Sequence, residues 1–424
     1  MSQTLDLIRP YIRKHFQLTR TEFVPGKTRI PLTVPTYGSE EVEEAVDSLL
    51  STWVSMGAKV KKFEEAFAKY NGSKHAVMVN SGSSANLLAL ATLRNPLLSE
   101  PMEKGSEIIT PAVTWATTVY PIVNVGCTPV LVDVDPRTLN IIPELLEKAV
   151  SPKTEAIVPV HLLGGPCQVD KIERIAEEHD LYFVEDACES TGAEVQGRKV
   201  GSFGDMGTFS FFISHHISTI EGGMIVTDND ELHEYLKAMR AFGWVRDLRD
   251  KNRYASENKG IDSRFLFVTD GYNLRPTEIQ GAFGVHQIKK LDRFIETRRR
   301  NAAYWSRKLS SYSDMLILPE EQLGTKHVYF GYHLTVTPEA PFDREQLVSH
   351  LESRLIETRP IMAGNIAEQP VMTHLSHRIS GTLDNSRMIM RNSFFFGNHM
   401  GIGEEEREYI AESIVDFANR ASKQ

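Results

Sequence analysis

The chain has 424 residues, of which 24% are charged and 41% hydrophobic, and its 47 Lys and Arg against 56 Asp and Glu give a net charge of −9. This composition is typical of a globular protein and excludes the disordered, collagen-like and disulfide-rich miniprotein classes. The acidic balance argues against an extended nucleic-acid surface, but it is compatible with a local anion site built from backbone amides.

Three cysteines, Cys127, Cys167 and Cys188, occur without any closely spaced pair. An odd number of unpaired cysteines in a long chain predicts reduced thiols and a cytoplasmic protein. The first ten residues lack a basic leader followed by an apolar stretch, and no run approaches the roughly 20 apolar residues that cross a bilayer. We therefore expect no membrane association.

Residues 1–24 predict one amphipathic helix that ends in a turn at Pro25-Gly26, an appendage to the main fold. Two more helices are expected at residues 40–52 and 59–70.

Short apolar strands then alternate with helices. The expected strands are 75–79, 107–110, 129–134, 156–160, 181–185, 208–212 and 224–227, and the expected helices are 83–93, 114–125, 143–149 and 169–179. Alternation at this spacing predicts an α/β fold with a mostly parallel central sheet and flanking helices.

The last third of the chain has a different pattern. A long helical stretch at residues 276–311 is broken near Leu291, and a strand at 329–336, a helix at 344–355 and a terminal helix from Ile402 follow. We expect an N-terminal helical appendage at 1–28, a large α/β domain at 29–290 and a small C-terminal α+β domain at 291–424. Residues 245–267 show no clear period, which predicts a long functional loop or an excursion from the main fold.

The first candidate site follows the first strand, in the segment Asn80-Ser-Gly-Ser-Ser-Ala-Asn86. Small residues at the start of a helix allow backbone N–H groups to close on a phosphate, which the helix dipole also favours. A plain strand-to-helix turn capped by Ser83 explains the segment equally well.

Further polar groups follow other strands. Asp186 and Glu189 come at the end of an apolar strand, where open α/β sheets bind ligands, although Asp186 could simply cap a helix. His215 and His216 follow the strand that contains Ser210, and they have no Cys or His partner at zinc-ligand spacing, so no metal site is expected.

Taken in order, these segments resemble the nucleotide-sugar aminotransferases and their dehydratase relatives, which are fold-type I enzymes dependent on pyridoxal phosphate. The resemblance runs from about Arg29 to the C-terminus. It implies a large domain that binds the cofactor. It also implies that the cofactor-binding residues are Gly82, Ser83 and Ser210 at the phosphate, Trp115 stacked on the ring, Asp186 at the ring nitrogen, Glu189 near the ring, and Asn273 reaching the phosphate across a homodimer interface.

One departure separates the chain from the aminotransferases. In those enzymes a lysine stands five residues after the serine that corresponds to Ser210, whereas this chain has His215. Imidazole forms no stable Schiff base, but it is a good general base near neutral pH. The change is similar to that in the nucleotide-sugar 3-dehydratases. It implies that His215 is the catalytic residue, acting on pyridoxamine phosphate that is bound without a covalent link.

The same resemblance implies the reaction and its partners. A nucleotide-linked 4-keto-6-deoxyhexose would lose its C3 hydroxyl, ammonia would be released, and L-glutamate would restore pyridoxamine 5′-phosphate from pyridoxal 5′-phosphate. Arg359, Asn365 and His399 would contact the sugar or glutamate, although each could be an ordinary loop residue. Three cysteines cannot hold the four-cysteine iron–sulfur cluster of one related 3-dehydratase, so we expect the cluster-free type.

Two other functions remain open from the sequence. An aminotransferase could use another lysine, of which Lys199 is the nearest, and a protein that had lost its lysine could bind cofactor or sugar without turnover. The residues do not identify the nucleotide, which could be GDP, CDP or dTDP, and His216 could be only structural.

Overall fold

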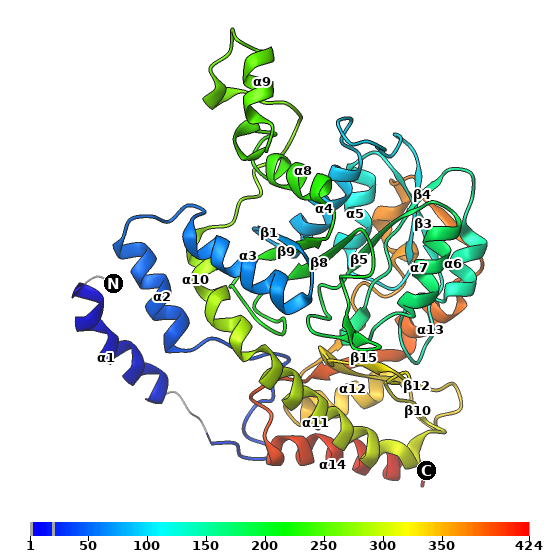
Figure 1. The fold of residues 1–424 in the computed structure, drawn as a ribbon. Coiled ribbons are helices and arrows are strands. Elements are labelled where there is room, and N and C mark those ends of the chain that lie inside the picture. Colours follow the sequence, from blue (N-terminus) through cyan, green and yellow to red (C-terminus); the bar gives the residue numbers. More distant parts are fainter. Residues whose placement is uncertain (1–2, 19–21, 424) are drawn as a thin grey trace.

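A computed structural model describes residues 3–18 and 22–423 of the chain. Its centre is an eight-stranded sheet with the order β1-β9-β8-β5-β4-β2-β3-β14, covered by helices on both faces (Figure 1). The strands are β1 (His75–Val79), β2 (Glu107–Pro111), β3 (Thr128–Val132), β4 (Thr154–Ile157), β5 (Tyr182–Asp186), β8 (Met206–Ser210), β9 (Gly223–Thr227) and β14 (Arg378–Ser380). The expected α/β fold with its central sheet is confirmed.

The sheet is parallel from β8 to β14, and only β9 runs antiparallel to its neighbours β1 and β8. Strands β2, β8 and β9 are buried along their whole length, as expected for a sheet covered on both faces. The covering helices are α3 (Ala58–Asn71), α4 (Gly82–Leu93), α5 (Ala116–Asn124), α6 (Pro143–Ala149), α7 (Val169–Glu178) and α8 (Asp230–Arg240).

The C-terminal lobe is built on a four-stranded sheet with the order β10-β12-β15-β13. Its elements are β10 (Leu316–Ile317), β12 (Gly331–Val336), β13 (Thr358–Pro360), β15 (Ser393–Gly397), α11 (Leu291–Leu309), α12 (Arg344–Ser353), α13 (Asp384–Asn392) and α14 (Glu404–Ala421). Trp305, Tyr332 and Phe396 are fully buried at its centre, with ring centroids 4.9–5.4 Å apart.

Two segments cross between these parts. Ile30 comes before the large sheet in sequence, but it pairs with Ile356 and is buried in the core of the C-terminal lobe. In the other direction, β14 joins the edge of the large sheet, where Arg378 forms two hydrogen bonds with the Glu107 carboxylate. The boundary that the sequence predicts at residue 290 falls in a short turn, η4 (Ile288–Lys290), between α10 (Glu278–Gln287) and α11, and it stays a prediction.

At the N-terminus, α1 (Gln3–Leu18) lies beside α2 (Ser39–Leu50), as Figure 1 shows, and residues 1–2 and 19–21 of the predicted appendage lie outside the described residues. The side chains of Arg9 and Arg13 both bind the Glu43 carboxylate. No helix of the described chain is long and apolar enough to cross a membrane.

Residues 245–267 form an excursion from the main fold, but the helix within the segment was not predicted. The segment contains a helix, α9 (Lys251–Glu257), between two short turns, η2 (Val245–Asp247) and η3 (Ser263–Phe265), and it projects from the body at the top of Figure 1. No residue of α9 is buried, so its sequence has no apolar period that could have predicted a helix. Three more strands, β6 (Glu194–Val195), β7 (Arg198–Lys199) and β11 (Thr325–Lys326), form a small separate sheet.

One buried ion pair joins three elements at the β1 edge of the large sheet. The Arg240 guanidinium on α8 donates to the Glu64 carboxylate on α3 at 2.7 Å and to the carbonyl of Met78 on β1 at 2.6 Å. Glu64 also accepts the Met78 N–H at 2.8 Å. Only 6% of the Arg240 side chain and 18% of the Glu64 side chain are exposed.

We predict that Arg240→Met lowers the free energy of unfolding by about 3–5 kcal/mol, because it leaves a largely buried carboxylate without its cation. Urea denaturation followed by tryptophan fluorescence measures this change. Arg253→Met is the matched control, since the Arg253–Glu257 pair on α9 is exposed and its loss costs at most about 1 kcal/mol. Equal losses in the two variants would contradict the assignment of Arg240 as a buried clamp.

Candidate active site

A cavity of about 480 Å³ lies at the carboxyl ends of the parallel strands, between the large sheet and the C-terminal lobe. This is where open α/β sheets bind ligands. Seven residues singled out in the sequence line it together: Gly82, Ser83, Trp115, Asp186, Glu189, Ser210 and His215.

One end of the cavity is formed by the start of α4. Ser81 caps this helix, since its hydroxyl accepts the Ser84 N–H at 3.1 Å, and Gly82 and Ser83 form the first turn. A Cβ on Gly82 would lie 2.4 Å from the Cβ of Ser210, so only glycine allows β8 to approach the helix this closely. Backbone N–H groups and the Ser210 hydroxyl thus meet at a helix N-terminus, an arrangement that suits a phosphate.

Asp186 occupies the middle of the cavity floor and is 4% exposed. Its Oδ2 accepts hydrogen bonds from Asn86 Nδ2 at 2.9 Å and from Thr118 Oγ1 at 2.8 Å. Its Oδ1 accepts the Cys188 N–H at 3.2 Å. This second oxygen therefore has a lone pair for a further donor, such as a protonated ring nitrogen.

Glu189 presents a carboxyl group to the same cavity and accepts the Leu163 N–H at 2.8 Å. Burial, reinforced by the nearby Asp186 carboxylate, raises the pKa of Glu189 to about 8, although the Leu163 N–H acts in the opposite direction. Glu189 is thus a neutral acid at pH 7, able to donate a hydrogen bond.

His215 lies in the loop between β8 and β9, which leads directly out of the sheet beside Ser210. Burial and the charge of Arg298 lower its pKa to about 3. The imidazole is therefore neutral, with a lone pair that can accept a proton. Ser214 Oγ lies 3.4 Å from its Nδ1, and the Phe330 ring packs edge-on against it at 5.2 Å.

No lysine is among the described residues that line the cavity. Lys199, the alternative from the sequence, lies on β7, where it stacks over the Tyr70 ring at 4.8 Å and forms an ion pair with Glu194 at 3.8 Å. Two of the three cysteines, Cys127 and Cys167, are buried outside the cavity, and no cluster of His, Cys, Asp and Glu in the described chain is placed to hold a metal ion.

Trp115 precedes α5 at the cavity wall with 54% of its surface exposed, so its ring is free to stack on a flat ligand. Asn273, in contrast, is exposed outside the cavity, where its Oδ1 accepts a hydrogen bond from Arg275. Its predicted contact with the cofactor requires a partner subunit and stays a prediction.

The three predicted substrate contacts are also outside the lining. Arg359 is the nearest candidate, because it is half-exposed on β13 and pairs in register with Phe395, which does line the cavity. Glu357 binds both Arg359, at 2.9 Å, and Arg29, at 3.1 Å, so two guanidinium groups lie on one carboxylate.

Asn365 and His399 use their polar atoms within the chain. Asn365 is fully buried and caps the short helix η6 (Ile366–Glu368). His399 accepts the Gly401 N–H at Nδ1 and donates from Nε2 to the carbonyl of Pro31 at 2.8 Å. It therefore holds the segment whose next residues, Leu32 and Thr33, line the cavity. The single chain gives no support for direct substrate contacts by these two residues.

Several site residues were not predicted from the sequence. Asn86 and Thr118 hold Asp186, and Asn86 could have been found because it lies on the same face of α4 as the first turn, one turn further on. Phe330, Met362 and Phe395 line the cavity from the C-terminal lobe. Apolar side chains such as these carry no recognisable pattern in a sequence.

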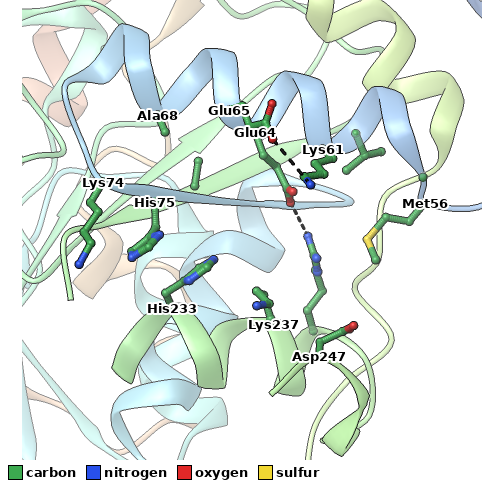
Figure 2. A pocket seen from close by; sticks show the side chains of 14 residues that line it. Met56, Lys61, Glu64, Glu65, Ala68, Lys74, His75, His233, Lys237 and Asp247 are labelled. Carbon is green, nitrogen blue, oxygen red and sulfur yellow. Dashed lines mark hydrogen bonds and ion pairs between the residues drawn. The ribbon is translucent and has the colours of Figure 1, made fainter. Parts of the chain in front are cut away.

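A second cavity, of about 440 Å³, lies between α3, β1 and α8 (Figure 2). Its side chains include Lys61, Lys74, His75 and Lys237 together with the clamp formed by Glu64 and Arg240. Lys74 and His75 both bind Asp230, at 2.7 and 2.6 Å. Because its cations are matched by acidic partners, this cavity does not assemble groups for chemistry.

Comparison with known proteins agrees with the geometry of the first cavity. GDP-4-keto-6-deoxy-D-mannose 3-dehydratase of Escherichia coli O55:H7 is 42% identical over 390 residues, which cover 91% of this chain and 99% of that protein. dTDP-4-dehydro-2,6-dideoxy-D-glucose 3-dehydratase of Saccharopolyspora spinosa is 36% identical over 99% of this chain and 92% of its own.

Solved structures of comparable sequence identity share the fold. A crystal structure of GDP-4-keto-6-deoxymannose 3-dehydratase with a trapped geminal diamine of pyridoxal phosphate and glutamate superposes with a TM-score of 0.86 at 40% identity, covering 91% of this chain and 99% of that one. The model of the DegT/DnrJ/EryC1/StrS aminotransferase family matches residues 35–415. With nine-tenths of its length matched, the chain belongs to the DegT/DnrJ/EryC1/StrS aminotransferase family.

Proposed function

We propose that the protein is a 3-dehydratase that removes the C3 hydroxyl of a nucleotide-linked 4-keto-6-deoxyhexose, with pyridoxamine phosphate as cofactor and glutamate as the amino donor. The observation that carries this proposal is His215, a neutral imidazole in a cavity whose described lining contains no lysine. The family depends on pyridoxal phosphate. Two relatives at 42% and 41% identity and a third at 36% are nucleotide-sugar 3-dehydratases, which are lyases.

The residues of the cavity suit pyridoxamine phosphate without any change of fold. The start of α4 and Ser210 would bind its phosphate, Trp115 would stack on its ring, and the free lone pair of Asp186 Oδ1 would accept the ring N–H. When bound, the cofactor supplies an amine for the C4 ketone and a conjugated ring that accepts electrons.

The chain itself supplies proton transfer and orientation. His215 would take a proton from the carbon that carries the cofactor amine and then deliver it to the departing C3 hydroxyl. Because its pKa is lowered to about 3, His215 is unprotonated at neutral pH and, once it has taken a proton, gives it up readily. Glu189 would donate a hydrogen bond as a neutral acid, so the cavity gains no second negative charge beside Asp186.

The finer parts of the proposal concern substrate and assembly. We take a GDP-linked sugar as the first candidate, on the 42% identity to a GDP-sugar enzyme, with a dTDP-linked sugar next. The exposure of Asn273 fits a residue that contacts the cofactor of a second subunit, as expected for a homodimer. A cytoplasmic place in deoxysugar biosynthesis for O-antigen would follow from such a substrate.

The decisive experiment is a product balance with a panel of GDP-, CDP- and dTDP-linked 4-keto-6-deoxyhexoses and glutamate. A dehydratase releases ammonia and 2-oxoglutarate in equal amounts and forms a 3-deoxy-4-keto sugar. An aminotransferase, the alternative from the sequence, forms 2-oxoglutarate and an amino sugar without ammonia. A binding protein forms none of these products, and either of the last two outcomes would overturn the proposal.

We predict that His215→Lys abolishes dehydration and creates a covalent link between the chain and pyridoxal phosphate, because an amine replaces the imidazole at the end of β8. Borohydride reduction followed by mass spectrometry should find the pyridoxyl group on residue 215 of the variant and on no lysine of the unmodified chain. An adduct on any native lysine would refute the role of His215.

We predict that Glu189→Gln removes a pH dependence of stability. The pKa of Glu189 rises from 4.5 in the unfolded chain to about 8 in the folded one, so the folded state loses stability as pH rises between these values. Glutamine keeps the acceptor for the Leu163 N–H and cannot ionise. Without cofactor, the thermal midpoint of the variant minus that of the unmodified protein should increase as pH rises from 5 to 8. A difference that stays constant over this range would contradict the assignment.

We predict that Arg359→Met raises KM about 10-fold for either the sugar nucleotide or glutamate, because a charge-assisted hydrogen bond is lost. Steady-state kinetics with each substrate varied in turn identifies which anion Arg359 binds. Arg29→Met is the matched control, since it removes the other guanidinium on Glu357 from a more exposed position. An unchanged KM for both substrates would exclude Arg359 from the site.

A further inference from the structure

The backbone between β11 and β12, at residues Val328–Phe330, is bound from all sides by buried groups. The N–H groups of Val328 and Phe330 donate to the carbonyls of Gly164 and Leu163, both at 2.9 Å. The Tyr329 N–H donates to His327 Nδ1 at 2.9 Å. Three donors of one short segment are thus satisfied in the interior.

The three carbonyls of the same segment are bound by side chains. Val328 O accepts from His216 Nε2 at 3.1 Å, and Phe330 O accepts from the Arg298 guanidinium at 2.8 Å. Asn398 donates to Tyr329 O at 3.3 Å. His216, Arg298 and Asn398 are each at most 2% exposed, and Arg298 forms no ion pair with a carboxylate of the described chain. The buried Arg298 guanidinium therefore binds and orients the backbone of this segment.

The segment is also strained. Tyr329 has φ +47° and Leu163, which faces it, has φ +50°, both in the left-handed region that side chains disfavour. A Cβ on Gly164 would lie 2.5 Å from the Tyr329 nitrogen, so the two turns interlock. Strain of this kind persists only where surrounding contacts impose it, and it clusters at functional sites.

This segment presents one ring to the site. Phe330 lines the cavity, and its ring lies 5.2 Å from the His215 ring at 74° and 6.1 Å from the His216 ring at 54°. His216 has no exposed surface and does not line the cavity, so it cannot touch a substrate.

We propose that His216 and Arg298 are positioning residues, which hold the Phe330 ring against His215 and so fix the direction in which this imidazole faces the cavity. The inference rests on the proposed role of His215 as the base. The sequence left the role of His216 open, and this proposal gives it one, which is to hold the Val328 carbonyl in place. A misplacement of about 1 Å at a reacting group can cost on the order of 100-fold in rate.

The test compares two variants of His216. His216→Phe keeps a ring but removes the donor to Val328, whereas His216→Gln supplies an N–H with a similar reach. For the first variant we expect kcat for dehydration to fall by about 10- to 100-fold with KM for the sugar nucleotide nearly unchanged, and for the second we expect kcat to recover most of that loss.

His350→Phe is the matched control. His350 donates from Nε2 to the carbonyl of Ser413 at 3.1 Å, the same bond at the same length, but it lies on α12 away from the cavity. Its loss should lower thermal stability and leave kcat unchanged. An equal fall of kcat in this control would show a general effect of destabilisation and would overturn the inference.

Phe330→Leu provides the second measurement if His216→Phe does not fold, since it removes the ring and leaves the bonds of the segment intact. Its kcat should fall in the same way, and a normal kcat in either variant would overturn the inference. A crystal structure of each folded variant should show the His215 ring turned from its original direction, and an unmoved ring would also overturn it. Absence of dehydration in the unmodified protein would instead reject the proposed function.

Discussion

The Asp186 carboxylate lies at the end of β5 and needs donors in place of the water that it loses, and three neighbouring segments supply them. Asn86 comes from α4, Thr118 from α5 and the Cys188 N–H from the turn that follows the strand. Because hydrogen bonds weaken steeply when donor and acceptor are misaligned, these bonds favour one position of both helices relative to the sheet. The start of α4, with its backbone N–H groups, and Trp115 at the start of α5 are placed as a consequence.

Burial also explains why the two groups proposed for proton transfer, Glu189 and His215, are uncharged. Burial acts in opposite directions on acids and bases, so it raises the pKa of Glu189 to about 8 and lowers that of His215 to about 3. Both groups are then uncharged at pH 7 beside a carboxylate that is held by its own donors. One environment thus gives an acid that keeps its proton and a base that is free to accept one.

The sequence was sufficient to predict the large sheet and the residues that follow its strands. The strands of the parallel sheet form short, mainly apolar segments between helices, and Asp186, Ser210 and His215 stand at or just after the ends of two of them, so their meeting at one edge follows from topology. The strand β14 could not be predicted, since three residues give no period.

The C-terminal lobe was less predictable because its contribution depends on packing. Phe330 and Phe395 line the cavity as ordinary apolar residues, and nothing local marks them. Conversely, Asn365 and His399 stand in segments similar to those of the family, yet their polar atoms bind the chain itself. Whether a polar side chain faces a ligand or its own backbone is decided by contacts distant in sequence.

The two crossing segments have a mechanical consequence. The N-terminal stretch around Ile30 completes the C-terminal lobe, and β14 returns from that lobe to complete the large sheet. Burial of Ile30 in the C-terminal core holds the first crossing in place, and the Arg378–Glu107 pair holds the second. The cavity is therefore lined by residues of both parts, whose relative position these two crossings help to hold.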